Sequence, residues 1–104
     1  MQPAKALAWE EYLRFHNKKN KGRCTRLGIF ENGEDYWIES GLALSNIETD
    51  RQTDGVGMTI ILGNYTHAIR DVRSLALRFS LAADEDGVDI TDGEGRVTTL
   101  RFEN

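Results

Sequence analysis

The sequence is poor in cysteine, proline and histidine. Cys24 is the one cysteine, Pro3 is the one proline, and only two histidines occur among the 104 residues. A single thiol cannot close an internal disulfide, which fits a reducing compartment. Two histidines and one cysteine without ligand spacing do not predict a zinc site. We therefore expect a cytoplasmic protein that holds no metal and no other cofactor.

Long apolar runs are also absent. No stretch approaches the roughly 20 apolar residues of a membrane span, and the first residues lack the pattern of a secretory signal. The composition, 39% hydrophobic and 29% charged, is that of an ordinary globular protein. The sequence therefore predicts one soluble domain over residues 1–104, with no membrane association.

The net charge of −4 is unevenly distributed along the chain. Residues 1–26 hold seven basic and two acidic groups, whereas the remainder holds six basic and fifteen acidic groups. The basic run of Lys18, Lys19, Lys21 and Arg23 is a candidate nucleic-acid contact. An acidic chain lacks the usual electrostatic footprint of a nucleic-acid-binding domain, so this interpretation is an alternative and not the main one.

One amphipathic helix is predicted, at about residues 4–16. Trp9, Tyr12, Leu13 and His16 recur at i, i+3, i+4 and i+7 and form one apolar stripe. The polar run that follows, 17–22, ends in glycine and is expected to end the helix. The aromatic stripe needs an apolar surface to cover, and a sheet is the candidate.

The rest of the chain, from about residue 23 to 103, reads as strands separated by turn residues. The period-two apolar pattern predicts strands at 23–30, 36–39, 56–62, 65–69, 72–81, 88–91 and 96–102, with a weaker pattern at 42–47. The pairs at 32–33 and 63–64 are Asn-Gly and Gly-Asn hairpin signals. In the segment 72–81, Leu75, Leu77, Phe79 and Leu81 share one face; a helix is the competing interpretation, and the strict alternation favours a strand.

Connections of hairpin length require antiparallel pairing. The predicted fold is therefore α+β: a mainly antiparallel meander of about seven strands, able to curl into a roll or barrel, with the N-terminal helix packed on it. We take the hairpin at 58–70 as the centre of the fold, because Ile60 and Ile61 make its first strand apolar on both faces.

Few side chains suggest chemistry. Tyr65 and His67 share one face of a strand and are candidates for lining a ligand pocket, but no nucleophile or metal ligand stands at a fitting distance in the sequence. The acidic residues at 84–94 do not match an EF-hand loop, and no glycine-rich phosphate loop occurs. The sequence predicts no catalytic residue.

Several short motifs taken in order resemble a family of small bacterial proteins described only as a domain of unknown function. They are the Trp-led helix at 9–13, Leu-Ser-Asn-Ile at 44–47, Ile-Ile-Leu-Gly at 60–63, Tyr-Thr-His-Ala-Ile at 65–69, Asp-Gly-Glu-Gly at 92–95 and Thr-Thr-Leu-Arg-Phe at 98–102. The resemblance implies one compact cytoplasmic domain and no assigned activity.

Three hypotheses about function follow. The first is a non-enzymatic binding or assembly module that can form a homodimer through an exposed strand edge or take a protein partner. The second is a ligand-binding domain or minor enzyme with a pocket near Tyr65 and His67. The third is nucleic-acid contact through the basic run after the helix.

Overall fold

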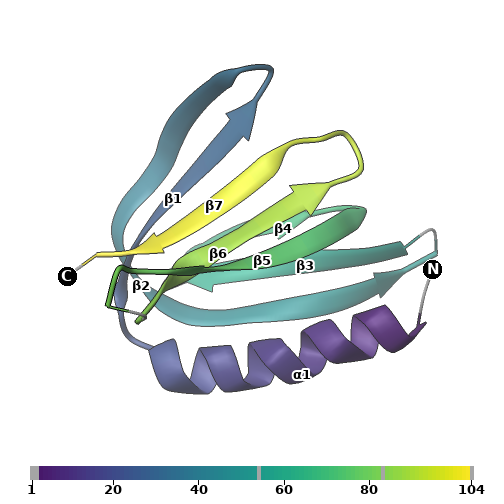
Figure 1. Cartoon of the computed structure of the whole chain (residues 1–104), viewed down its shortest axis with the longest axis horizontal. Helices are drawn as coiled ribbons and strands as arrows, with labels where there is room; N and C mark the ends of the chain where they lie inside the picture. Colours follow the sequence, from purple (N-terminus) through teal and green to yellow (C-terminus); the bar gives the residue numbers. More distant parts are fainter. Residues whose placement is uncertain (1–2, 54, 83, 104) are drawn as a thin grey trace.

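The computed structural model describes residues 3–53, 55–82 and 84–103, with side chains from residue 7 onward. The described chain forms one helix and seven strands, as the sequence predicts (Figure 1). The elements are α1 (Pro3–Asn20), β1 (Cys24–Glu31), β2 (Glu34–Gln52), β3 (Gly55–Leu62), β4 (Tyr65–Ile69), β5 (Val72–Phe79), β6 (Glu85–Asp92) and β7 (Val97–Phe102).

All seven strands form one antiparallel sheet in the order β4-β3-β2-β1-β7-β6-β5. The two edge strands, β4 and β5, follow each other in the chain, and β3 contacts β5. The sheet is therefore curled into a half-barrel, and β4 and β5 are not paired in the described chain. The α+β prediction is confirmed. The placing of the 58–70 hairpin at the centre is wrong, because β7 pairs with β1 and makes β1 the central strand.

The helix covers the inner face of the curled sheet and packs most extensively against β2. Leu13 is buried in the same core as Leu27 and Leu100, His16 is buried beside Phe102, and Trp9 and Tyr12 pack at the margin of this core. The predicted apolar stripe is thus confirmed. Its burial holds the helix in place, since helix propensity alone stabilises a segment of this length only marginally.

The helix ends later than predicted, at Asn20 instead of near residue 16. The reason is a tertiary contact: the side-chain amide of Asn17 donates to the carbonyl of Ile47 at 2.8 Å and its oxygen accepts from the Ile47 N–H at 3.0 Å. This pair joins the last turn of α1 to β2 and stabilises a turn that the local sequence does not favour. Gly22, at a φ of 89°, then lets the chain reverse.

The region 34–52 is one continuous strand of 19 residues, where the sequence predicted a short strand at 36–39 and a weaker strand pattern at 42–47. Gly41 has a φ of 87°, and the pairing of β2 shifts register next to this position and again between Leu44 and Asn46. Such irregularities bend a strand and break its period-two pattern. The bend lets β2 contribute to both halves of the sheet.

The strand predicted at 72–81 is confirmed as a strand, but it ends at Phe79 and is less buried than predicted. Leu75 packs against the core, whereas Leu77 and Phe79 are exposed and Leu81 lies fully exposed beyond the strand. The physical reason is that β5 is an edge strand, which pairs only with β6 among the strands that the structure describes.

Candidate functional site

The outer face of β1, β7 and β6 forms the floor of the candidate site. Gly28 on β1 lies opposite Thr99 on β7, and Thr99 lies opposite Asp89 on β6. Because side chains alternate along a strand, these residues face away from the core that Leu27 and Leu100 occupy. A row of small and polar groups therefore crosses three adjacent strands.

Trp37 on β2 lies opposite Gly28 and rests on it. A Cβ atom at position 28 would come within 2.7 Å of Cε3 of the indole, so the ring needs glycine at this point. The guanidinium carbon of Arg26 lies 4.1 Å from the centroid of the indole, a cation–π contact. Trp37 is thus held on two sides while 48% of it remains exposed.

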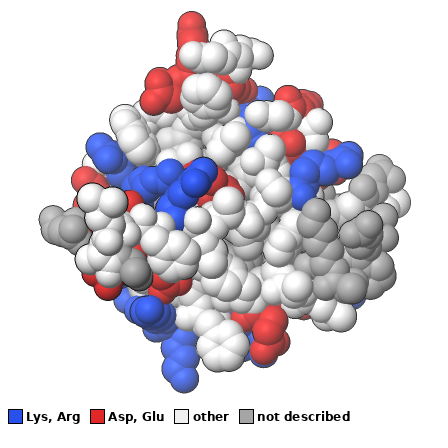
Figure 2. Space-filling view, in the orientation of Figure 1, with Lys and Arg blue, Asp and Glu red and all other residues white. Residues whose placement is uncertain are grey.

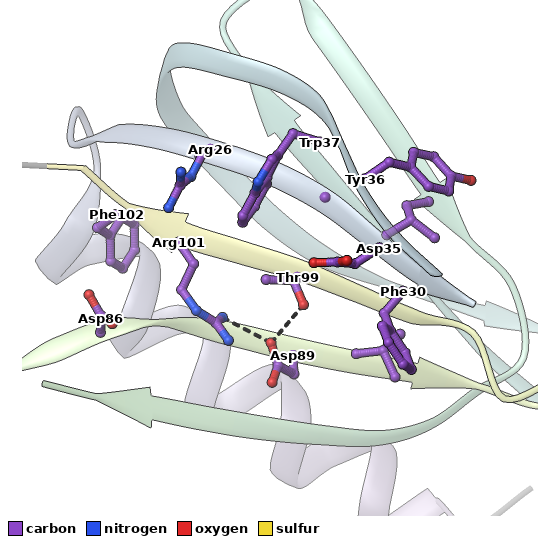
Figure 3. Close-up of a pocket in the computed structure, with 13 residues that line it drawn as sticks. Arg26, Phe30, Asp35, Tyr36, Trp37, Asp86, Asp89, Thr99, Arg101 and Phe102 are labelled. Atoms are coloured by element: carbon purple, nitrogen blue, oxygen red, sulfur yellow. Dashed lines mark hydrogen bonds and ion pairs between the residues drawn. The ribbon is translucent and has the colours of Figure 1, made fainter. Parts of the chain in front are cut away.

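These residues enclose a groove of about 590 Å³. Figure 3 shows Trp37 projecting over β7 with Arg26 on one side and Asp35 on the other, and Phe30 and Asp86 at opposite ends. Aromatic and charged groups thus converge on a recess in the sheet. This combination is typical of a ligand site, where apolar surface supplies affinity and a few polar groups fix orientation.

Asp89 is the buried charge beneath the groove and is only 8% exposed. Its carboxylate accepts hydrogen bonds from Arg78 Nε at 2.6 Å, Arg101 Nη1 at 2.9 Å and Thr99 Oγ1 at 3.0 Å. Burial by itself would raise the pKa of Asp89, but the bonds from Arg101 and Arg78 outweigh it and lower the pKa below its ordinary value. The carboxylate is therefore ionised near neutral pH, and its bonds fix Arg101.

Charges that stay unpaired in the groove are available to a ligand. Among the residues that the structure describes, Arg26, Asp35 and Asp86 make no ion pair. The five N–H donors of Arg26 are thus oriented by stacking on Trp37 and left open. Figure 2 shows positive and negative side chains interspersed around a largely uncharged middle of this view, so no field of one sign dominates it.

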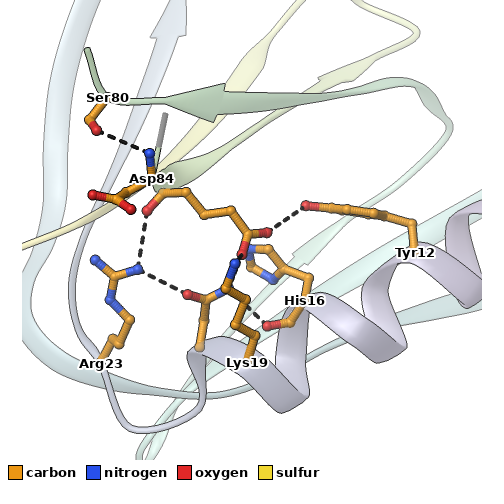
Figure 4. Close-up of polar contacts among 8 residues, drawn as sticks. Tyr12, His16, Lys19, Arg23, Ser80 and Asp84 are labelled. Carbon is orange, nitrogen blue, oxygen red and sulfur yellow. Dashed lines mark hydrogen bonds and ion pairs between the residues drawn. The ribbon is translucent and has the colours of Figure 1, made fainter. Parts of the chain in front are cut away.

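A second polar cluster lies where α1 meets β6 (Figure 4). The Glu85 carboxylate accepts from the Tyr12 hydroxyl and from Asn20 Nδ2, each at 3.4 Å, and lies 3.2 Å from Lys19 Nζ. Burial would raise the pKa of Glu85, but its bonds with Lys19 and Asn20 lower it overall. Burial and the neighbouring Glu85 both raise the pKa of Tyr12. These bonds tie the helix to the sheet, which is a structural role.

His16 lies in the same cluster and is 1% exposed. Its ring stacks on Phe102 with a centroid distance of 5.7 Å, and neither ring nitrogen has a hydrogen-bond partner in the described part of the chain. Burial lowers the pKa of His16; the nearby Glu85 opposes this shift and Arg23 adds to it. The imidazole is therefore neutral at pH 7.

Tyr65 and His67, the predicted pocket candidates, lie next to each other on the inner face of the edge strand β4 and are half-buried. Burial, and to a lesser degree Arg96, lowers the pKa of His67. Neither residue lines the groove. A pocket at this pair stays a prediction.

Two of the four basic residues predicted for nucleic-acid contact have structural partners. Lys19 pairs with Glu85, and Arg23 stacks 4.2 Å over the ring of Phe102 and donates to Asn20. Lys18 and Lys21 are exposed. The four basic residues lie together at the end of α1. Of these, only Lys18 and Lys21 are exposed without an ion pair to a described residue.

The residues described contain no group of three His, Cys, Asp or Glu side chains that could hold a metal ion, and α1 is too polar to cross a bilayer. No family model, curated protein or solved structure matches the chain significantly. The resemblance to a family of unknown function therefore stays a prediction.

Sequence reasoning missed the groove. Its members come from strands far apart in the chain, as Trp37 and Thr99 illustrate. One signal was present: Gly28 interrupts a strand of larger residues, and an isolated glycine in a strand often marks a close approach of another group.

Proposed function

We propose that the protein is a small non-enzymatic binding module whose ligand lies in the groove against Trp37. The observation that carries the proposal is the fixed position of this side chain. The half-exposed indole packs on Gly28, and the guanidinium carbon of Arg26 lies 4.1 Å from the ring centroid. An exposed aromatic side chain that is already rigid loses little entropy when a partner covers it. Tryptophan and arginine are also the residues that most often dominate binding energy.

The same residues favour binding over catalysis. Asp89 is the buried ionisable group of the groove, and its carboxylate is committed to Arg78, Arg101 and Thr99. A general base needs a free lone pair within reach of substrate and a pKa near neutrality. The hydrogen bonds that lower the pKa of Asp89 make it unsuited to that role.

The groove favours a small ligand or a peptide segment that carries both an apolar face and an acidic group. The apolar face would lie along the indole of Trp37, and the acidic group would accept the paired N–H donors of Arg26. Asp35, on the other side of the indole, favours a hydrogen-bond donor at that end of the ligand.

An NMR screen tests this proposal. Backbone amide and indole spectra of the ¹⁵N-labelled chain are recorded with N-acetylated amino acids, nucleoside monophosphates and monosaccharides. We expect at least one class to shift the resonances of Trp37 and Thr99 saturably, and Trp37→Ala to abolish the effect. Phe15→Ala is the matched control, because Phe15 is exposed but lies on the helix. Binding that survives Trp37→Ala would refute the groove as its site.

A second candidate function, assembly with another copy of this chain, is supported by β5. One side of this edge strand pairs with no other strand that the structure describes, and the strand ends in exposed Leu77 and Phe79, followed by Leu81. Apolar edge strands are templates for pairing with another chain. An antiparallel pair of β5 strands centred on Ala76 would set Leu75 opposite Leu77 of the second copy and bury both.

We further propose a cytoplasmic location and membership of the small bacterial family that the chain resembles. The single cysteine, Cys24, is exposed as a free thiol, which supports a reducing compartment. Two alternatives remain proposals: a ligand pocket near Tyr65 and His67, and nucleic-acid contact through Lys18, Lys19, Lys21 and Arg23. The first would be favoured if probe binding responded to His67→Ala and not to Trp37→Ala. The second would be favoured if nucleic-acid binding responded to Lys18→Ala with Lys21→Ala and not to Trp37→Ala.

A further inference from the structure

Three arginines converge where the two edges of the curled sheet come together. Arg51 lies near the end of β2, Arg70 in the connection between β4 and β5, and Arg73 near the start of β5. With Gln52, Thr53 and Asp71 they line a pocket of about 660 Å³. No apolar side chain is among its described lining residues, and it shares none of them with the groove at Trp37.

Asp71, which also lines this pocket, has a left-handed backbone conformation. Its φ is 51°, in the left-handed region that residues other than glycine seldom adopt. The Gly93 N–H donates to the Asp71 carbonyl at 2.9 Å. A Cβ atom on Gly93 would overlap the Asp71 carboxylate, and one on Gly55 would lie 3.4 Å from it. Gly93 therefore leaves the space that the Asp71 carboxylate occupies, whereas a side chain at Gly55 would make only an ordinary contact with it. Aspartate tolerates a left-handed φ better than most residues do.

The Asp71 carboxylate orients Arg73. The Arg73 guanidinium meets both carboxylate oxygens, with Nε 3.2 Å from Oδ1 and Nη2 3.2 Å from Oδ2. A guanidinium held on one side by a carboxylate has a fixed plane. The pair with Asp71 thus fixes the orientation of the Arg73 guanidinium at the wall of the pocket.

The described lining of the pocket carries an excess of positive charge, because it holds three guanidinium groups and the one carboxylate of Asp71. Outside the lining, Glu10 lies 3.5 Å from Arg51. Arg70 is exposed and makes no ion pair with the described residues. Gln52 adds an amide that packs over Gly57, where a Cβ atom would come within 2.7 Å of Nε2.

We propose that this pocket binds an oxyanion of the size of phosphate, either free or as a monoester. Planar guanidinium groups match the oxygen spacing of phosphate, and amide and hydroxyl donors from Gln52 and Thr53 complete the set. A bound carboxylate-sized anion would use fewer of these donors. The binding does not depend on the groove at Trp37.

Titration of the ¹⁵N-labelled 104-residue chain with sodium phosphate tests the proposal, with sodium chloride at matched ionic strength as the reference. Arginine Nε–Hε resonances and the amides of Thr53 and Asp71 are expected to shift saturably with phosphate and not with chloride. A parallel arm uses glycerol 3-phosphate, and the tighter ligand of the two shows whether the free ion or the monoester is preferred.

Two variants show where the anion binds. Arg70→Gln, which removes an exposed charge without a described ion pair, is expected to weaken binding by about tenfold or more, the effect of losing a charge-assisted hydrogen bond. Arg14→Gln, another exposed arginine, on α1, is the matched control and should leave the affinity unchanged. The proposal is overturned if neither phosphate compound gives a saturable shift, or if Arg70→Gln binds as tightly as Arg14→Gln.

Discussion

The imidazole of His16 stacks on Phe102 with ring centroids 5.7 Å apart, in a site where the histidine is almost fully buried. Burial lowers the pKa of His16, so the unfolded chain takes up a proton at higher pH than the folded chain does. The free energy of unfolding should therefore be constant above about pH 7.5 and fall below the unfolded pKa of about 6.5, by up to about 1.4 kcal/mol per pH unit. Urea unfolding from pH 8 to 5 measures this slope.

Substitution separates His16 from the other histidine. His16→Leu should remove much of the slope between pH 7 and 5. At pH 7.5 it should be neutral or stabilise by up to about 1 kcal/mol, because two ring nitrogens without partners leave the core. His67→Gln should keep most of the slope, since His67 is only half-buried. An unchanged slope in His16→Leu would show that another group controls the acid transition.

Asp89 should be the most costly charge to remove. Asp89→Ala leaves Arg101 and Arg78 without their shared carboxylate, and we expect a loss of about 2–4 kcal/mol in the free energy of unfolding. Glu11→Ala, which breaks the exposed pair with Arg14, should change stability by less than about 0.5 kcal/mol. Urea denaturation at pH 7 compares the two. Equal losses of unfolding free energy in the two variants would mean that the buried Asp89 pairs stabilise the fold no more than the exposed Glu11 pair does.

The contribution of Asp89 should also depend on pH. Because its folded pKa is lowered, the stabilisation is present above the unfolded pKa of about 4 and is lost as pH falls through the folded pKa. The difference between the wild type and Asp89→Ala should accordingly shrink below pH 4. A difference that stayed constant to pH 2 would contradict this assignment.

Asn17→Ala should weaken the attachment of α1 to β2. The substitution removes both bonds between the Asn17 amide and the Ile47 backbone, and the expected loss is about 2 kcal/mol. Hydrogen exchange of the amides at 17–20 should rise more than that of the helix centre. Lys18→Ala is the control, since Lys18 is exposed on the same turn. Equal protection in both variants would rule out the amide pair as the cause of the longer helix.

Self-association through β5 should depend on its apolar end. Sedimentation analysis of the wild type at increasing concentration should show a dimer, and Phe79→Lys should abolish it by placing a charge on the paired edge. Cys24→Ser serves as the control, because the exposed thiol offers a different route to a dimer. A wild-type protein that stays monomeric at every concentration would exclude this function.

Local pattern was enough to predict what kind of element most of the chain forms. The alternation in β3, β4 and β7 and the Gly63 turn are properties of neighbouring residues, and the strands appear where predicted. The length of β2 could not be predicted, because Gly41 and its register shifts disrupt the period-two signal without ending the strand. The end of α1 was missed because Asn17 is stabilised by a partner thirty positions away.

The candidate site depends on sheet order, which the local pattern does not encode. Only the pairing of β1 with β7 brings Gly28 next to Thr99, and only that of β6 with β7 adds Asp89. The sequence marked His67 because histidine is chemically versatile, whereas the groove is formed by Trp37 and Arg26, which a local pattern treats as ordinary strand residues.

The most direct test of the binding proposal follows the fluorescence of Trp37 alone. The sequence holds two tryptophans, so Trp9→Phe leaves Trp37 as the one reporter. Titration with the probe class selected by NMR should change the emission of Trp37 saturably. Gly28→Val, which displaces the indole from its position on β1, should weaken binding by tenfold or more while the protein stays folded. Unchanged affinity in folded Gly28→Val, or emission that does not respond to any bound probe, would contradict the account.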